Sequence, residues 1–225
     1  MPWTFAHPAA VLPLRRLGLS GAGLVIGSLA PDFGYYLGLF ELATWAHAWW
    51  GVALICLPSA WLVHRLWLWA WRPLAGLLPS RHREALVTHA PVRPGLGIFG
   101  LSAALGAATH ALWDAFTHRT GWFVQHWPWL REPLAPGLPA FQALQHASTL
   151  IGCAALLITY WRWLPAGHEP EDARCWRDLL LLAGAVLAVA WLAVGAPWRA
   201  HFHFLIVATD AWLLGALALA FWRQR

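Results

Sequence analysis

Three ionisable side chains stand four residues apart in the segment His110-Ala-Leu-Trp-Asp114-Ala-Phe-Thr-His118. Successive residues of an α-helix are about 100° apart, so positions i, i+4 and i+8 form a stripe on one helix face. Imidazole nitrogens and carboxylate oxygens are ligands of zinc and also of iron or manganese. The spacing therefore predicts a metal site, and an interhelical hydrogen-bond network is the alternative interpretation.

Further candidate ligands lie in the N-terminal part of the chain. Asp32 follows Pro31, which favours the end of a short helix with the carboxylate held at a turn. Capping of the next helix is the alternative role for this aspartate. Ionisable groups are expensive inside a membrane and are functional candidates there by default. The predicted metal ligands are His7, Asp32, His47, His110 and Asp114.

Other polar residues are expected at the same membrane face. We predict that His118 or His146 moves a proton as a general acid or base. Arg119, next to His118, is expected to receive an anionic group of the substrate. A supporting role around the ligands is predicted for His126, His203 and Asp210.

Long apolar stretches must position these residues. The chain has 225 residues, of which 60% are hydrophobic and 11% are charged, a composition typical of a membrane protein. A membrane span needs about 20 mostly apolar residues. Five stretches qualify, at roughly 46–70, 95–117, 141–164, 179–196 and 202–222.

The N-terminal segment has a different character. Residues 8–40 are apolar but are interrupted by glycine and proline, which predicts short or re-entrant helices. We expect an all-α, polytopic membrane helical bundle that forms a single domain over residues 1–225. It would consist of short helices in 1–45 and a five-span bundle in 46–225.

The arginines predict the orientation of this bundle. With five crossings, one side carries the connections 71–94 and 165–178 and the C-terminus, and it holds about twice as many arginines as the other side. That side is predicted to be cytoplasmic, so the polar cluster would face outward.

Basic residues in short loops report topology, which argues against a nucleic-acid partner. The cysteines, Cys56, Cys153 and Cys175, have no paired spacing that would predict a disulfide framework or a cysteine metal site.

Several motifs together resemble a known family. They are MPWTFAHPAAVLPLRRLGL, GSLAPDFGYYL, THALWDAFTHRTGWFVQH and LQHAS, in that order. The chain resembles the bacterial membrane family catalogued as domain of unknown function 4184. More distantly, the Pro-Asp turn and the His-x3-Asp helix are similar to predicted membrane-bound metal-dependent hydrolases. In those proteins the turn is rich in aspartate, whereas here Asp32 is followed by Phe33, so the resemblance leaves the presence of a second metal open.

These observations predict a membrane-embedded hydrolase that uses one or two divalent ions, with zinc favoured. Its expected substrate is a lipid or isoprenoid phosphate or ester at the extracytoplasmic leaflet of a bacterial cytoplasmic (inner) membrane. Two other classes remain open: a transporter or proton-relay protein, and a non-enzymatic lipid-binding or assembly protein. Histidine and aspartate chains do form proton paths. However, the polar residues thin out toward the predicted cytoplasmic half, where His64 stands almost alone.

Overall fold

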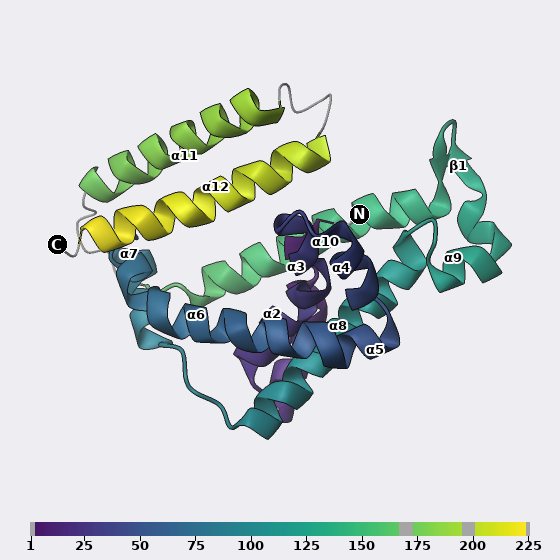
Figure 1. Ribbon diagram of the computed structural model, residues 1–225, viewed down its shortest axis with the longest axis horizontal. Coiled ribbons are helices and arrows are strands. Elements are labelled where there is room, and N and C mark those ends of the chain that lie inside the picture. The colour runs from purple at the N-terminus through teal and green to yellow at the C-terminus, as the bar shows by residue number, and fades with distance from the viewer. Residues whose placement is uncertain (1–2, 167–172, 195–200, 224–225) are drawn as a thin grey trace. The chain divides into compact units, whose positions relative to one another are not determined.

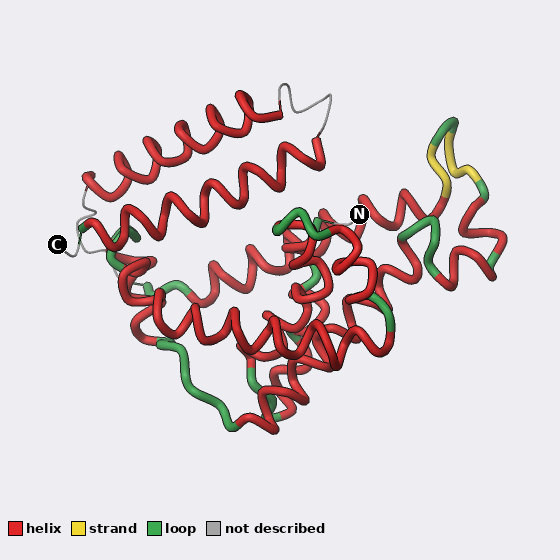
Figure 2. Tube along the Cα trace, in the orientation of Figure 1, coloured by secondary structure: helices red, strands yellow, loops and turns green. Residues whose placement is uncertain are grey.

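The computed structural model describes residues 3–166, 173–194 and 201–223, and nearly all of them are helical (Figure 1; Figure 2). Within this described part of the chain, five helices are long and apolar enough to cross a membrane. They are Trp49–Ala75, Leu96–His126, Ala140–Trp163, Ala173–Val194 and His203–Trp222. The predicted all-α polytopic bundle with about five spans is confirmed, and each predicted stretch overlaps one of these helices.

The segment before the first span folds into short helices, as its glycines and prolines predict. They are η1 (Thr4–Ala6), α1 (Pro8–Val11), η2 (Pro13–Leu17), α2 (Gly21–Leu29), η3 (Ala30–Asp32), α3 (Phe33–Tyr36) and α4 (Phe40–Ala46). Gly18 ends η2 with a φ of 71°, a left-handed conformation that glycine adopts readily. Ser20 then caps α2, because its hydroxyl accepts a hydrogen bond from the N–H of Gly23 at 3.1 Å.

The first span consists of three consecutive helical segments. They are α5 (Trp49–Gly51), the π-helical η4 (Val52–Cys56) and α6 (Leu57–Ala75). Pro58 stands just after the π-helical turn, cannot donate a backbone hydrogen bond and crowds the turn before it. A wider turn at this point relieves that crowding.

Small residues let α2 lie directly against α8 (Leu96–Thr117). A Cβ atom at Gly27 would lie only 2.2 Å from the carbonyl oxygen of Ala103, and one at Gly106 only 2.3 Å from that of Leu24. Such close backbone approach is typical of small residues at helix interfaces in membranes. It brings the end of α2 beside the half of α8 that carries the predicted His-x3-Asp stripe.

The chain then passes through a small excursion before the third span. It consists of α9 (Trp122–His126), η5 (Pro128–Arg131), β1 (Pro133–Ala135) and β2 (Leu138–Pro139), and it leads into α10 (Ala140–Trp163). The two strands pair antiparallel, and Gly137 makes the turn between them with a φ of 76°. No pattern noted in the sequence predicted this hairpin.

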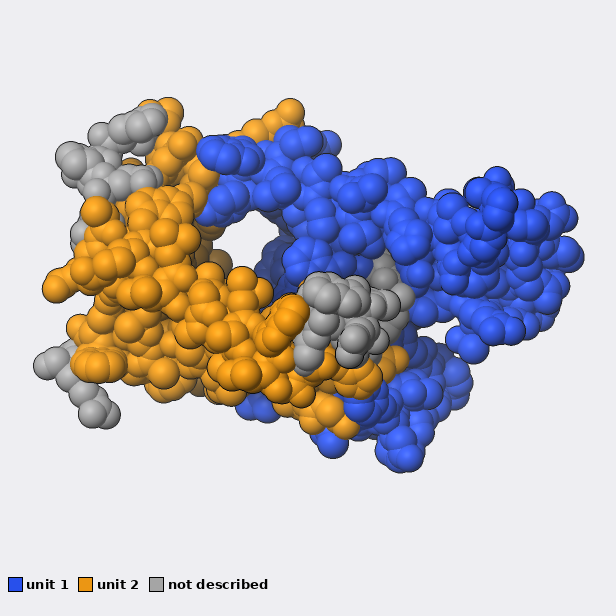
Figure 3. Space-filling model, turned by 90° about the horizontal axis from the view of Figure 1, so that it is seen from above, with its two compact units in different colours: residues 1–34, 39–64, 93–161 blue, residues 35–38, 65–92, 162–225 orange. Residues whose placement is uncertain are grey.

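The packing divides the chain into two compact units (Figure 3). Unit 1 comprises residues 1–34, 39–64 and 93–161, and unit 2 comprises residues 35–38, 65–92 and 162–225. Unit 2 contains α7 (Ser80–Thr88) and the paired helices α11 (Ala173–Val194) and α12 (His201–Trp222), which run side by side (Figure 1). The predicted single-domain organisation stays a prediction.

Candidate metal centre

Asp32 is the most deeply placed carboxylate of unit 1. It ends η3, immediately after Pro31, and its side chain is fully buried. The hydroxyl of Thr4 donates a hydrogen bond to its Oδ2 at 2.5 Å. The other oxygen, Oδ1, faces the rings of His47 and His110. A buried carboxylate needs such partners, because an isolated charge is very costly away from water.

His47 stands at the C-terminal end of α4, where the backbone fixes its orientation. Its Nδ1 lies 2.7 Å from the carbonyl oxygen of Ala43. A carbonyl can only accept, so this Nδ1 carries a hydrogen and donates it. The opposite nitrogen, Nε2, lies 3.5 Å from Oδ1 of Asp32 and 3.5 Å from Oδ2 of Asp114.

His110 is oriented in the same way by a different helix. Its Nδ1 donates to the carbonyl oxygen of Ser28 at 2.7 Å, across the close interface between α2 and α8. Its Nε2 lies 3.3 Å from Oδ2 of Asp114 and 3.6 Å from Oδ1 of Asp32. At metal-ligating histidines, the ring nitrogen that does not bind the metal commonly donates a hydrogen bond to a group such as a backbone carbonyl.

The second oxygen of Asp114 faces two further rings. Nε2 of His7 lies 3.6 Å from Oδ1 of Asp114, and Nδ1 of His118 lies 3.3 Å from the same oxygen. The rings of His7 and His110 are stacked, with their centroids 3.7 Å apart. Nδ1 of His118 also lies 3.2 Å from the backbone carbonyl of Asp114. Asp114 therefore connects all the histidines of the site.

The electrostatics of the site favour two ionised carboxylates with neutral and charged imidazoles around them. Burial and, to a smaller extent, the neighbouring ring of His110 lower the pKa of His7 to about 4, so His7 is neutral at pH 7. Burial also lowers the pKa of His47, but Asp114 and Asp32 outweigh it and raise the pKa to about 10. Burial raises the pKa of Asp32, whereas the rings of His110 and His47 and the hydroxyl of Thr4 hold it well below its usual range.

The residues present fit a metal ion. Among the described residues, several buried atoms of the site have no hydrogen-bond partner, namely Nε2 of His7, His110 and His118 and Oδ1 of Asp32 and Asp114. Two sets of three residues offer ligand atoms that lie within 4.8 Å of one another: His7, His110 and Asp114, and Asp32, His47 and His110. Ligand atoms about 2.1 Å from a tetrahedral zinc ion are about 3.4 Å apart. The nitrogen-to-oxygen distances of 3.3 to 3.6 Å match that spacing.

The structure brings together every residue that was predicted as a metal ligand, with His118 beside them. Of the other predicted site residues, three lie in unit 1 outside this cluster and two lie in unit 2. In unit 1, His126 stacks on Trp122, and the side chains of Arg119 and His146 are exposed. In unit 2, His203 and Asp210 lie on α12. The roles proposed for these five residues stay predictions.

Sequence reasoning missed the groups that orient the ligands. Thr4 holds Asp32, and the carbonyl oxygens of Ser28 and Ala43 hold the two central histidines. Ala43 could have been found, because it precedes His47 by one helical turn. The other two contacts join segments that are far apart in the sequence, so no local pattern could predict them.

Comparison with known families bears out the resemblance seen in the motifs. A family described as a domain of unknown function (DUF4184) matches residues 1–222. No curated protein and no solved structure matches the chain. The more distant similarity to predicted metal-dependent hydrolases stays a prediction.

Proposed function

Because the chain belongs to the DUF4184 family, whose description names no activity, we propose its function from the site itself. We propose a membrane-embedded, metal-dependent hydrolase that acts on a lipid or isoprenoid phosphate or ester. One observation carries this proposal: two carboxylates and several imidazoles, deeply buried, turn bare oxygen and nitrogen atoms toward one another. Repulsion between electron-rich atoms requires a cation or a proton between them, and intramembrane groups of this kind are functional candidates by default.

The arrangement favours one ion. Both candidate ligand sets contain His110, and its Nδ1 is committed to the carbonyl of Ser28. A single lone pair on Nε2 can therefore serve only one ion. We propose that Asp32, His47, His110 and Asp114 hold it, and that His7 borders it through Asp114.

The donor set also bears on which ion binds. Two imidazoles and two carboxylates suit zinc, with iron and manganese as the other candidates. Such an ion, when bound, would polarise a phosphoryl or acyl oxygen and acidify a water molecule. We favour zinc because the four nitrogen-to-oxygen distances, 3.3 to 3.6 Å, are close to the separation of ligand atoms around that ion.

Residues around the ligands supply the remaining chemistry in this proposal. His118 is favoured as the proton carrier, because its Nδ1 is anchored on Asp114 while its Nε2 has no hydrogen-bond partner among the described residues. For a phosphate monoester, the water oxygen joins phosphorus, the bond from phosphorus to the lipid oxygen breaks, and that oxygen takes up a proton. Arg119, which follows His118, and His146 on α10 are exposed and can reach a substrate rather than the ion.

The membrane setting narrows the substrate. His110 and Asp114 lie on a helix that is apolar enough to span a bilayer, and His47 lies two residues before another. We therefore expect that an amphipathic lipid reaches the site directly. The bias of arginine toward the opposite side supports an outward-facing site in a bacterial cytoplasmic membrane, with the C-terminus in the cytoplasm.

Metal analysis of the purified protein tests the centre. We expect wild type in lipid nanodiscs to hold one equivalent of a divalent metal, measured by mass spectrometry of the elements. His110→Ala and Asp114→Ala should lose most of it, because each removes a central ligand. His89→Ala is the matched control, since this histidine lies in unit 2 and bonds to the backbone of Ala85. A wild-type protein without stoichiometric metal would refute the proposed centre.

Activity measurements then address the reaction. Polyprenyl phosphates and phospholipids should be hydrolysed by the metal-loaded protein, and a chelator should abolish the release of phosphate or fatty acid. Proton flux into liposomes that persists after chelation, with no hydrolysis of either lipid class, would instead identify a transport or relay protein.

A further inference from the structure

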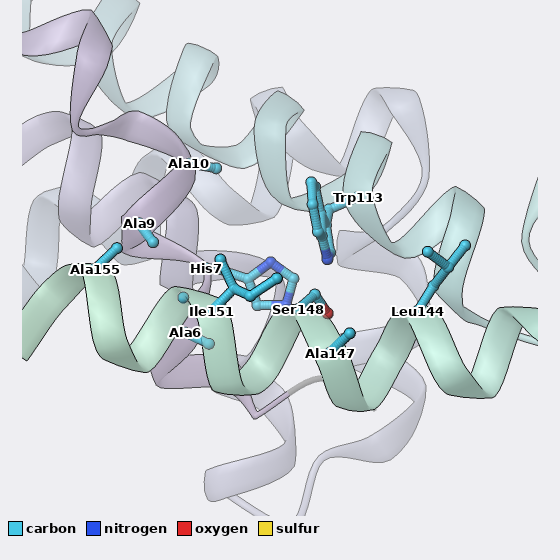
Figure 4. A pocket seen from close by; sticks show the side chains of 11 residues that line it. Ala6, His7, Ala9, Ala10, Trp113, Leu144, Ala147, Ser148, Ile151 and Ala155 are labelled. Carbon is cyan, nitrogen blue, oxygen red and sulfur yellow. The ribbon is translucent and has the colours of Figure 1, made fainter.

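An apolar groove of about 330 Å³ lies in unit 1, between the N-terminal short helices, α8 and α10 (Figure 4). Most of its lining is aliphatic or aromatic, including Trp113 on α8 and Leu144, Ala147 and Ile151 on α10. His7 is the only titratable residue among those that line it, and Figure 4 shows its ring behind α10, beside Ile151 and Ser148. The groove and the candidate metal centre therefore share one imidazole.

The dimensions of the groove fit a hydrocarbon chain of one leaflet. Its lining on α10 extends from Leu144 to Ala155, which is a rise of about 16 Å at 1.5 Å per residue. One leaflet contributes about half of the roughly 30 Å hydrocarbon core of a bilayer. Both α8 and α10 are candidate spans, so a groove that they line is expected at the depth of the hydrocarbon core.

The side chains that line the groove also favour a hydrocarbon chain over a peptide or a polar metabolite. A peptide laid in this groove would leave most of its backbone N–H and C=O groups without partners, because among the described residues only Ser148, His7 and the indole N–H of Trp113 bring polar side-chain groups to the lining. A soluble polar metabolite would meet the same problem. A hydrocarbon chain needs no partners and gains contact with the aliphatic walls.

His7 contacts both the groove and the candidate metal centre. Its side chain is 2% exposed, and its Nε2 lies 3.6 Å from Oδ1 of Asp114. One side of the ring thus lines the groove while its nitrogen faces the cluster. Building on the hydrolase function proposed above, we propose that the groove binds the hydrocarbon chain of the substrate, a long-chain phosphate ester that enters sideways from the bilayer. Its phosphoryl group then lies at the metal centre.

Filling the groove tests this proposal. Ala147→Trp places a bulky ring on the lining, whereas Leu150→Trp changes an exposed residue of the same helix, three positions further on, that does not line the groove. The probes are radiolabelled dodecylphosphonate, which has a chain and resists hydrolysis, and methylphosphonate, which has the head group alone. Binding is measured at equilibrium in nanodiscs of phosphatidylcholine, with metal content determined on the same samples.

We expect Ala147→Trp to weaken dodecylphosphonate binding about tenfold, the effect of displacing roughly two methylene groups from apolar contact. Its binding of methylphosphonate and its metal content should equal those of wild type, and Leu150→Trp should match wild type with both probes. Unchanged dodecylphosphonate binding in Ala147→Trp, or an equal loss in Leu150→Trp, overturns the groove assignment. Absence of metal from every protein is a separate result that overturns the hydrolase proposal. Wild type that binds neither probe overturns both.

Discussion

Replacing Gly106 by alanine tests whether the contact between α2 and α8 sets up the metal centre. The added Cβ would lie 2.3 Å from the carbonyl oxygen of Leu24 and 2.7 Å from the backbone nitrogen of Ser28. An ordinary carbon-to-oxygen contact is about 3.3 Å or longer, so the two helices must separate by about 1 Å. Both of these are backbone atoms, so no side-chain rotation can relieve the contact.

Separating α2 from α8 would disturb the metal centre through a single hydrogen bond. Nδ1 of His110 lies 2.7 Å from the carbonyl oxygen of Ser28, and a shift of about 1 Å lengthens this to about 3.7 Å, beyond hydrogen-bond range. Loss of a group that orients a metal ligand typically weakens metal binding by about 10- to 100-fold. We therefore expect Gly106→Ala to bind zinc about 10- to 100-fold more weakly than wild type.

The assay is competition for zinc against a chromophoric chelator, with the protein in nanodiscs. Gly100→Ala is the matched control, because it lies on the same helix and its Cβ would meet no atom within 4 Å. Circular dichroism of both variants establishes that the helices remain. If Gly106→Ala is folded and binds zinc as tightly as Gly100→Ala, the packing of α2 on α8 does not support the ligands and the reasoning fails.

Other predictions concern the groups around the ligands. Thr4→Val removes the hydrogen bond to Asp32 and should weaken zinc binding about tenfold in the same competition assay. The control is Thr44→Val, because the hydroxyl of Thr44 bonds to a carbonyl of its own helix. Equal zinc affinities of the two variants would contradict this prediction. His118→Ala should retain metal while turnover falls about 100-fold or more, and a variant with full turnover would exclude His118 as the proton carrier. Because Asp114 and Asp32 raise the pKa of His47 to about 10 against the opposing effect of burial, this ring is protonated at pH 7 and must lose its proton to bind an ion. Calorimetry in buffers of different ionisation enthalpy should therefore detect proton release on zinc binding at pH 7, and no release would contradict this protonation state.

The parts of the structure that follow from local patterns could be predicted from the sequence. The five spans follow from apolar length, and the short helices of the N-terminal segment follow from its glycines and prolines. His110 and Asp114 share a helix face because of their spacing alone, whereas His118 follows the last residue of α8 in an extended conformation and was wrongly expected on the same helical stripe. The expected membrane location suggested His7, Asp32 and His47 as further metal ligands, because ionisable residues in such a segment need partners.

The hydrogen bonds that join segments far apart in the sequence could not be predicted. The backbone carbonyl of Ser28 reaches His110 across 82 positions of sequence, and the hydroxyl of Thr4 reaches Asp32 across 28. No periodicity encodes such contacts, because carbonyl groups are present at every residue. The groove beside His7 escaped prediction for the same reason, since its walls come from three separate parts of the chain.

The candidate ligands come from three separate stretches, namely residue 7, residues 32–47 and residues 110–114. An ion bound by the last two of these stretches, with His7 beside it, acts as a removable cross-link, and the short helices around His7 and Asp32 have few backbone bonds of their own to hold them in place. Any ligand that binds only the folded state adds to its stability, by about 4 kcal/mol at a thousandfold excess over its dissociation constant. Thermal unfolding of unit 1 should accordingly depend on zinc concentration, so that the melting temperature itself reports the occupancy of the site.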